Sequence, residues 1–488
     1  MIAVSIILPA LAGLLIFFLK KDRFDFIRRF LLLAISALHL VFCAFSWFFL
    51  PEAQLTGWLV LDPLGLLFLT ISSLIFFAVA IYAVGYFHSL KGLQGFMKIP
   101  EAAFTCCLLL TLSSMTLMCS SQHLGIFWIS LEASTLVSAP LIYFRRSNRS
   151  LEAAWKYLMI CSIGIALALL GNFFLAVAAS PPGGEPFSLV VGELVKGAHS
   201  LNTIWLRAGF LFIVVGYGTK MGLVPLHTWL PDAHSEAPCA VSALLSGALL
   251  NGAFLGILRV YQVCIAADQG AFCDSLLRGF GLFSIAIAAV FILSQKDFKR
   301  MLAYSSVEHM GILALGVGMG GAATFGAMLH AVNHSLVKAM LFLLAGNVLD
   351  FYHTKKISEV TGMLRTQPAT GALWVAGLFA ISGFPPFGTF LSEFVVLKGA
   401  FDGGFLLEGV ALLAFLSLIF IGMVSAFLPM SQGKKIVPEE GRHSYWKPSF
   451  WSIAPPLVLC CLALLIGCFL PPALQQLLHA AARSLGGS

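Results

Sequence analysis

The chain has 488 residues, of which 59% are hydrophobic and 10% are charged, and its formal net charge is +7. A mean hydropathy of +0.94 excludes a soluble enzyme and indicates a membrane protein with many spans. Eleven cysteines are scattered without a C-x-x-C pair, and no glycine-rich phosphate loop follows a strand pattern, so neither a metal cluster nor a nucleotide site is expected.

Apolar windows of bilayer length recur along the whole sequence. A helix needs about 20 mostly apolar residues to cross the hydrocarbon core, which predicts an all-α polytopic membrane protein with about fourteen transmembrane helices. Basic Lys20 and Lys21 follow the first window instead of preceding it, so we expect a retained helix and not a cleaved signal. The expected spans are residues 2–20, 30–50, 61–87, 101–119, 122–144, 152–178, 202–223, 236–265, 272–294, 301–319, 323–350, 370–401, 405–428 and 450–475.

Basic residues gather in alternate connections between the expected helices. The positive-inside rule places these connections in the cytoplasm. Both termini are therefore expected on the outer side of a bacterial or archaeal inner membrane, and the positive charge reflects topology instead of nucleic-acid binding. The basic residues are Lys20, Lys21, Arg23, Arg28, Arg29, Lys91, Lys98, Arg145, Arg146, Arg149, Lys296, Lys299, Arg300, Lys355, Lys356, Arg365, Lys434, Lys435, Arg442 and Lys447.

Ionisable residues inside apolar spans are the candidate functional residues, because a buried charge is costly and usually belongs to an ion pathway. Glu132 lies in the middle of FWISLEASTLVSAPLIYF. A carboxylate there can stay charged beside a cation or become protonated when it is desolvated, and packing through one interhelical bond is the alternative. Lys156, one turn into the next helix, is expected either to pair with Glu132 or to extend to the cytoplasmic face.

A lysine, Lys220, lies deep in an apolar run that Gly222 and Pro225 interrupt. An interrupted helix in mid-membrane leaves backbone carbonyls free to bind water or ions, which is a common arrangement in transporters. We therefore predict that Lys220 gains and loses a proton. His227 and His234 follow in the same interruption and are two further candidate proton carriers.

Three ionisable residues, His330, His334 and Lys338, are spaced by four residues and share one helix face. Their order suggests a proton wire, because histidine can accept a proton on one nitrogen while donating from the other. Packing histidines are one alternative, and a metal site is another that lacks a third ligand nearby. Glu308 and His309, in AYSSVEHMG, are expected either in an entry vestibule or at a helix cap.

Glu393 follows a second interruption, made by the glycines and prolines of GFPPFG at residues 383–388. The interrupted helices, seven and twelve, lie five helices apart. Because five is odd, the second unit would be inverted relative to the first. The predicted organisation is three N-terminal helices at 1–100, a first five-helix repeat at 101–265, an inverted repeat at 266–430, and a C-terminal loop and helix at 431–488.

The stretch KMGLVPLHTWLPDAHSEAPCAVSALLSG, with Glu132 before it and GFPPFGTFLSEF after it, resembles the antiporter-like membrane subunits of respiratory complex I, Mrp-type sodium/proton antiporters and energy-converting membrane hydrogenases. By this resemblance, Glu132 and Lys220 match the paired residues of the first half-channel. Lys338 matches the lysine of helix eleven, and Glu393 the last residue of the hydrophilic axis. The resemblance implies proton movement along this axis when a partner module undergoes redox chemistry.

One departure from the family concerns Asn251, which lies where many relatives carry a lysine linking the two half-channels. An asparagine can orient water but cannot hold a proton, so either water bridges the gap or the relay differs. The motifs AYSSVEHMG and NHSLVKAMLFLLAGN look closest to the hydrogenase-4 and formate hydrogenlyase-type branch. After helix fourteen only LQQLLHAAARSLGGS remains, so no long lateral helix is expected.

These features favour a proton-translocating subunit of a redox-driven oxidoreductase complex, of the membrane hydrogenase or complex I type. The expected partners are other membrane subunits, lipid, and a soluble redox module with Fe–S or NiFe centres, while this chain is expected to carry no cofactor. Two alternatives stay open: a sodium/proton antiporter subunit driven by ion gradients, and a structural subunit that has lost transport. Asn251 favours the second alternative, and the retained buried charges oppose it.

Overall fold

The computed structural model describes residues 1–90, 101–180, 188–433 and 449–487. Within these ranges the chain forms helices and a few isolated bridges, with no strand, so the predicted all-α class is confirmed. Two of the basic connections used for the orientation lie outside the described residues. Their members are Lys91, Lys98, Lys434, Lys435, Arg442 and Lys447.

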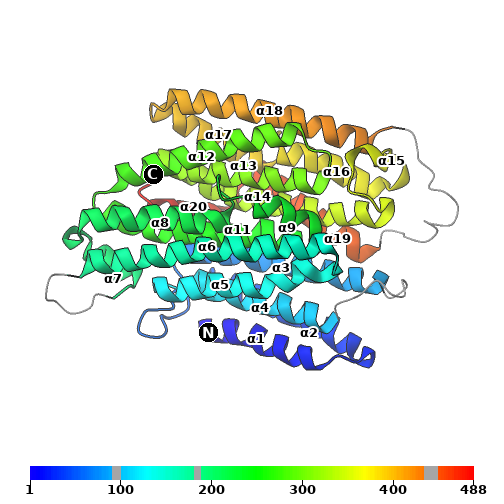
Figure 1. Cartoon of the computed structure of the whole chain (residues 1–488), viewed down its shortest axis with the longest axis horizontal. Coiled ribbons are helices and arrows are strands. Elements are labelled where there is room, and N and C mark those ends of the chain that lie inside the picture. Colours follow the sequence, from blue (N-terminus) through cyan, green and yellow to red (C-terminus); the bar gives the residue numbers. More distant parts are fainter. Residues whose placement is uncertain (91–100, 181–187, 434–448, 488) are drawn as a thin grey trace.

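Most of the helices run side by side along the long axis of the molecule, with α1 at one edge and α18 at the opposite edge (Figure 1). The first part contains α1 (Ile2–Phe18), α2 (Asp25–Ser46), α3 (Pro63–Leu90), α4 (Glu101–Ser120), α5 (Leu124–Ile142), α6 (Asn148–Ala179), α7 (Val191–Lys196), α8 (Thr203–Met221), α9 (Trp229–Glu236), α10 (Cys239–Leu244) and α11 (Leu250–Ala266). The second contains α12 (Gly270–Leu293), α13 (Phe298–Met319), α14 (Gly321–Tyr352), α15 (Met363–Thr366), α16 (Pro368–Ile381), α17 (Gly388–Asp402), α18 (Leu406–Ser431), α19 (Phe450–Cys468) and α20 (Pro472–Arg483).

Eleven helices of the described chain are long and apolar enough to cross a membrane, and two shorter apolar helices are α1 and α16. The expected count of fourteen differs at three places. The first window forms the 17-residue α1, and the twelfth is divided between α16 and α17. The tenth forms α13, whose first turn is polar and whose 22 residues are almost all buried. A multi-pass membrane protein is therefore confirmed at this coarser level.

Two segments form the centre of the bundle, α10–α11 and α14. The span Cys239–Ala266 is buried along its whole hydropathy window, whereas the peripheral α2 and α18 are buried over only a third of theirs. A helix that is apolar on every side belongs in the interior, and one with an outward apolar face belongs against lipid. The central helices carry Asn251, His330 and His334, so these polar candidates lie where lipid is excluded.

Small residues bring neighbouring helices into close contact. Gly216 of α8 faces Gly164 of α6, and a Cβ atom at Gly216 would lie 2.5 Å from the Gly164 carbonyl oxygen. Gly281 of α12 faces Gly311 of α13 in the same manner, at 2.7 Å. Close backbone approach through small residues is a main source of helix association in lipid, where no hydrophobic effect drives helices together.

The C-terminal part corrects one expectation. The last window, residues 450–475, does not form one helix, because α19 ends at Cys468 and Pro471 and Pro472 begin a separate helix, α20. This helix packs against α3 and α14, and the His479 ring stacks on Phe325 with ring centroids 4.5 Å apart. The segment expected as a short tail is thus part of the bundle.

The contact between α6 and α8 gives a stability prediction. Replacing Gly216→Ala places a methyl group 2.5 Å from backbone atoms of α6, which no side-chain rotation can relieve. We expect a destabilisation of about 1–3 kcal/mol, seen as a lower Tm of the purified protein in detergent. The matched control is Gly192→Ala in α7, where a Cβ meets nothing within 4 Å. Equal Tm values for the two variants would contradict the packing argument.

Candidate functional site

The first predicted interruption is present and holds Lys220 at the end of α8. The helix ends at Met221, and Gly222 adopts φ +89° while its N–H donates to the Gly218 carbonyl. A left-handed residue is the usual way to end a helix, and glycine has no Cβ to oppose it. After a seven-residue loop at 222–228, Trp229 begins α9 and its indole N–H donates to the Thr219 carbonyl oxygen at 2.8 Å.

Hydroxyl groups surround the Lys220 ammonium, whose side chain is fully buried. Its Nζ donates to Thr135 Oγ1 at 2.6 Å and to Tyr157 OH at 2.7 Å, and it lies 4.6 Å from the centre of the Tyr157 ring. Ser138 Oγ donates to the Ser134 carbonyl, so the Tyr157 hydroxyl, 2.7 Å away, donates to Ser138. The lysine therefore begins a hydroxyl chain that crosses from α8 through α6 to α5.

Glu132 lies on α5 one turn before Thr135 and does not touch Lys220 directly. One carboxylate oxygen, Oε1, accepts from Ser162 Oγ at 3.2 Å. The other, Oε2, is buried without a hydrogen-bond partner among the described residues. Residues three apart on a helix are neighbours, so Glu132 stands next to the hydroxyl that accepts a hydrogen bond from Lys220. The two residues of the expected pair are near each other but form no ion pair within the described chain.

Lys156 does not pair with Glu132. Its ammonium contacts Glu152 at 2.6 Å and Asp232 at 3.0 Å, and its side chain is 45% exposed. Of the two interpretations of this residue, a counter-charge and a side chain extended to a membrane face, the conformation matches the second. The contact with Asp232 also joins the start of α6 to α9.

The two histidines of the first interruption have different surroundings. His227, in the loop before α9, packs edge-on against Tyr304 with ring centroids 6.2 Å apart. His234, in α9, is fully buried and stacks on Phe342 of α14 at 4.8 Å. Neither His234 ring nitrogen has a hydrogen-bond partner in the part of the chain that the structure describes. His234 thus lies where the first interruption meets the second half of the chain.

Asn251 joins the two halves of the molecule. Its amide nitrogen donates to Ser335 Oγ of α14 at 2.6 Å and to the Gly247 carbonyl at 2.9 Å. The preceding segment, Leu245–Leu249, is a π-helix, which the sequence pattern does not reveal. Such segments occur often at functional sites because they re-aim neighbouring side chains. Asn251 Oδ1 is a buried acceptor without a partner among the described residues, and it could receive a hydrogen bond from water.

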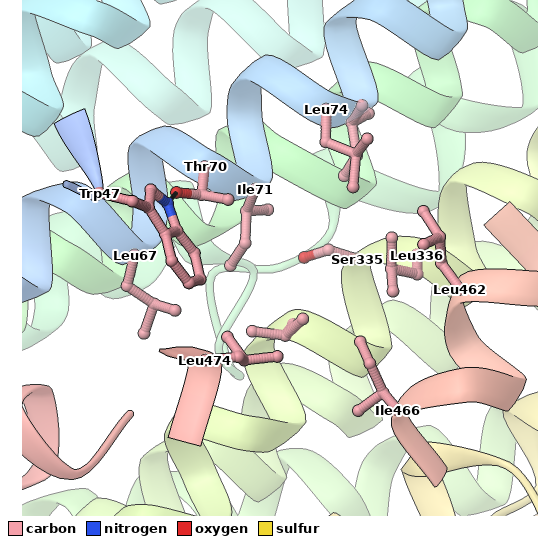
Figure 2. A pocket seen from close by; sticks show the side chains of 12 residues that line it. Trp47, Leu67, Thr70, Ile71, Leu74, Ser335, Leu336, Leu462, Ile466 and Leu474 are labelled. Carbon is pink, nitrogen blue, oxygen red and sulfur yellow. Dashed lines mark hydrogen bonds between the residues drawn. The ribbon is translucent and has the colours of Figure 1, made fainter. Parts of the chain in front are cut away.

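An apolar cavity of about 120 Å³ borders this junction. Figure 2 shows Thr70 and Leu67 of α3, Ser335 and Leu336 of α14, and side chains of α19 and α20 around it. The Ser335 hydroxyl lines the cavity and also accepts the hydrogen bond from the Asn251 amide. The other lining side chains are almost all apolar, so the Asn251–Ser335 hydrogen bond has hydrocarbon on one side.

The second half contains a chain of directed hydrogen bonds. Ser392 Oγ donates to the Thr389 carbonyl at 2.9 Å, so the Ser392 oxygen accepts from His330 Nδ1, also at 2.9 Å. His330 Nε2 then carries a lone pair and accepts from His309 Nδ1 at 2.8 Å. Among the described residues, His309 Nε2 is left buried without a partner, as the open end of the chain.

Lys338 and His334 lie on the same face of α14 as His330, as the spacing predicts. All three side chains are buried, and Lys338 Nζ donates to the Leu302 carbonyl oxygen of α13 at 2.8 Å. The His334 ring centre lies 4.9 Å from that of His309, which links the face of α14 to α13. Glu308, also buried on α13, has one carboxylate oxygen without a partner in the described ranges.

The second predicted interruption is also present, between Ile381 at the end of α16 and Gly388 at the start of α17. Gly383 has φ +60°, and a Cβ there would lie 2.0 Å from a Glu393 carboxylate oxygen. Glu393 therefore folds back against the interrupted backbone. Asn333 of α14 holds the end of this interruption in place, because its Nδ2 donates to the Gly388 carbonyl oxygen at 2.8 Å. Both interruptions thus place an ionisable side chain beside a break in the backbone.

Comparisons with known proteins agree with this arrangement. Residues 121–422, more than half of the chain, match the transmembrane family described as NADH:quinone oxidoreductase/Mrp antiporter. The chain belongs to this family. It is a membrane antiporter-like subunit of the kind found in complex I, membrane hydrogenase and Mrp assemblies.

Two relatives and one solved structure illustrate the similarity. The chain is 39% identical over 347 residues to the hydrogenase-4 component F homolog of Methylacidiphilum infernorum, covering 70% of this chain and 72% of the relative. It is 30% identical over 348 residues to NADH-quinone oxidoreductase subunit N of Desulforudis audaxviator, covering 71% and 67%. A chain of the archaeal membrane-bound sulfane sulfur reductase has the same fold, with a TM-score of 0.85 at 21% identity over 100% of this chain and 98% of that one.

Two buried cations of this antiporter-like subunit were not expected. Lys299 was assigned to a cytoplasmic connection, but it lies in the first turn of α13 and is fully buried. Its ammonium donates to the carbonyls of Ala237 at 2.6 Å and Ser235 at 3.3 Å, which end α9. Arg259 of α11 forms a bidentate ion pair with Asp62, with both N–O distances 2.5 Å. The only sequence signal for either residue is a basic side chain beside an apolar run.

Lys299 gives a second stability prediction. Replacing Lys299→Met leaves the carbonyls at the end of α9 without their donor, and a lost buried hydrogen bond to a charged group costs about 1.5–3 kcal/mol. We expect a lower Tm in detergent. The matched control is Lys355→Met, whose ammonium contacts Glu236 at 2.8 Å with a side chain 21% exposed. A Tm loss in the control as large as that of Lys299→Met would contradict a special role for the buried lysine.

Proposed function

We propose that this antiporter-like subunit translocates protons within a redox-driven oxidoreductase complex of the membrane hydrogenase or NADH:quinone oxidoreductase type. The observation that carries the proposal is the row of buried polar groups that runs from Lys220, through the Asn251–Ser335 junction, to His330, with the half-buried Glu393 beyond it. Unused buried charges are costly in a membrane. The relatives named hydrogenase-4 component F homolog and NADH-quinone oxidoreductase subunit N support the assignment to a redox complex.

The first half of the pathway works through the surroundings of Lys220. Its ammonium is held by two neutral hydroxyls, so no direct carboxylate contact locks the charge in place. Movement of Glu132 towards Lys220 would stabilise the ammonium, and movement away would favour transfer of its proton. The hydroxyls of Tyr157 and Thr135 relay such changes because each can donate and accept.

The second half works through imidazoles. A proton arriving at the free Nε2 of His309 allows the Nδ1 proton to pass to His330 Nε2, and the His330 Nδ1 proton then reaches Ser392. The Ser392 hydroxyl turns from the Thr389 carbonyl and releases its own proton towards Glu393. Ser392 adjoins Glu393, which we assign as the last proton station of the axis. Lys338 and His334 supply the start of this half, and His227, His234 and Lys156 belong to the first half at its cytoplasmic side.

Asn251 lies between the two halves of the pathway, and its amide side chain cannot hold a transferred proton. Its amide is fixed by Ser335 and Gly247, and the free Oδ1 offers one acceptor to a water molecule. We assign the junction to a water-mediated transfer between the halves. A chain that had lost transport would have no need for this aligned amide in a fully buried helix.

The membrane arrangement proposed with this function has fourteen crossings. The three beyond the eleven long apolar helices are α1, α13 and the interrupted α16–α17 pair. Residues 101–265 and 266–430 form two inverted five-helix repeats between the flanking segments 1–100 and 431–488, because an interruption beside an ionisable residue recurs after five crossings. Both termini lie on the outer side of a bacterial or archaeal inner membrane, as the basic connections indicate.

The partners in this proposal follow from what the chain itself contributes. It supplies proton stations and no redox group, so electrons move in a soluble module with Fe–S or NiFe centres, and neighbouring membrane subunits transmit the coupling. The exposed apolar side chains of the peripheral helices, such as Phe26 and Leu407, each 79% exposed, contact lipid or those subunits.

The role of Lys220 is tested by Lys220→Met in the intact complex. We expect loss of proton translocation, with redox turnover reduced or uncoupled, because methionine keeps the length of the side chain without a transferable proton. The measurement is proton yield per electron in sealed vesicles. The matched control is Lys356→Met, which removes a lysine that is 69% exposed and lies outside the proposed pathway, and it should keep most of the yield. An unchanged yield in Lys220→Met would sink the proposal.

The junction is tested at Asn251. We expect Asn251→Leu to lower the rate of proton transfer at least about tenfold, which corresponds to about 1.4 kcal/mol in the transfer barrier, and to lower the proton yield with it, because the aligned amide and its free acceptor are lost. Asn251→Lys should retain more yield than Asn251→Leu, since an ammonium can both hold a proton and reach the Ser335 hydroxyl. Equal yields in the two variants would show that protons do not cross at this residue.

A gradient-driven exchange of sodium for protons is the competing outcome. In vesicles that contain the complex but receive no electron donor, we expect a sodium gradient to move no protons. Sodium-dependent proton movement under those conditions would replace redox coupling by antiport, while the assignment of Lys220 as a proton station would stand.

A further inference from the structure

Three side chains at the end of the histidine chain have the composition of a metal site. His309 of α13, His330 of α14 and Glu393 of α17 each offer one ligand atom within 4.8 Å of the other two. The sequence spacing directs attention to His330 and His334, which lack a third ligand. The three-dimensional arrangement instead pairs His330 with His309 and brings the third ligand from a different helix.

Two of the three residues have buried polar atoms without a partner in the described part of the chain. Glu393 Oε1 is an unused acceptor, and His309 Nε2 is free to carry the imidazole proton when His309 Nδ1 binds an ion. A buried polar atom left unsatisfied costs free energy, which binding of a cation would offset. The third, His330, is held by Ser392, which accepts from Nδ1 and leaves the Nε2 lone pair directed at His309.

We propose that His309, His330 and Glu393 bind a divalent transition-metal ion of the zinc class. Two imidazoles and one carboxylate, with water in the fourth position, are a common donor set for Zn²⁺. The His330–Ser392 hydrogen bond supplies the outer contact that orients a metal-bound histidine. Magnesium and calcium prefer all-oxygen sites with more ligands, so the site selects against both.

The geometry requires only a local adjustment. Zinc bonds of about 2.0–2.1 Å in a tetrahedral arrangement separate ligand atoms by about 3.3 Å. The distance between His309 Nδ1 and His330 Nε2 must therefore increase from 2.8 Å. The distances from these nitrogens to the Glu393 oxygen must decrease from at most 4.8 Å. Glu393, the partly exposed member, adjoins the loop of the second interruption and provides the side from which an ion enters.

A bound ion would take the position of the proton shared by the two imidazoles, and the hydrogen-bonded chain would be broken there. Bound metal therefore blocks proton transfer to Glu393. This consequence rests on the proposed function, whereas metal binding itself does not.

The binding test uses Co²⁺ as a spectroscopic substitute for Zn²⁺ on the purified full-length chain in detergent. We expect a tetrahedral Co²⁺ absorption that Zn²⁺ displaces and Mg²⁺ does not. His330→Gln and Glu393→Gln should each weaken Co²⁺ binding at least about tenfold, by analogy with the loss seen when ligand-supporting contacts are removed. The matched control, His334→Gln, removes a neighbouring imidazole outside the triad and should keep the affinity. Absence of the absorption, or an equal loss in all three variants, would overturn the proposal.

A folding control uses the same variants. Zn²⁺ should raise the Tm of the unmodified chain and of His334→Gln, because a ligand that binds only the folded state stabilises it. It should leave the Tm of Glu393→Gln unchanged, and a rise in that variant would overturn the triad.

The transport test adds Zn²⁺ to vesicles that contain the intact complex, where proton yield per electron should fall. Co²⁺ binding without any fall would overturn the blocking step. Absence of Co²⁺ binding would overturn the site, while the proposed proton pathway, tested by Lys220→Met, would be unaffected.

Discussion

A charge inside this bundle persists only where polar groups replace the water that the hydrocarbon core lacks. Three lysines meet this requirement in three ways. Lys220 is held by hydroxyls, Lys338 by one carbonyl of α13, and Lys299 by two carbonyls at the end of α9. Each solution depends on a helix that ends or is interrupted nearby, or on a neighbouring helix that offers an oxygen. The interruptions of the backbone and the positions of the charges are therefore parts of one arrangement.

Much of this arrangement is visible in the sequence, because its causes are local. Glycine and proline close together within an apolar run predict an interrupted span, and the sequence predicts both interruptions, the one after Lys220 and the one before Glu393. The shared face of His330, His334 and Lys338 follows from helical spacing alone. The all-α class and the family follow from composition and from one long motif.

The partners of these residues could not be predicted, because they depend on how helices rotate and pack against each other. Thr135 and Tyr157 hold Lys220, but a threonine and a tyrosine in apolar spans look like ordinary packing residues. The pairing of His309 with His330 joins two helices whose relative register no local pattern determines. Lys299 was misplaced for a different reason: it lies at a helix boundary, where one turn decides between solvent and core.

The position of α20 has a consequence for biogenesis. Leu474 of this helix lines the cavity beside Ser335, and the helix packs against α3, which is synthesised long before it. Until α20 arrives, the cavity beside Ser335 lacks the wall that Leu474 supplies. Membrane insertion of this chain therefore cannot complete its centre in order from the N-terminus. The last wall of the cavity is added late, by a contact between distant segments, after the helices that carry Asn251 and Ser335 have been made.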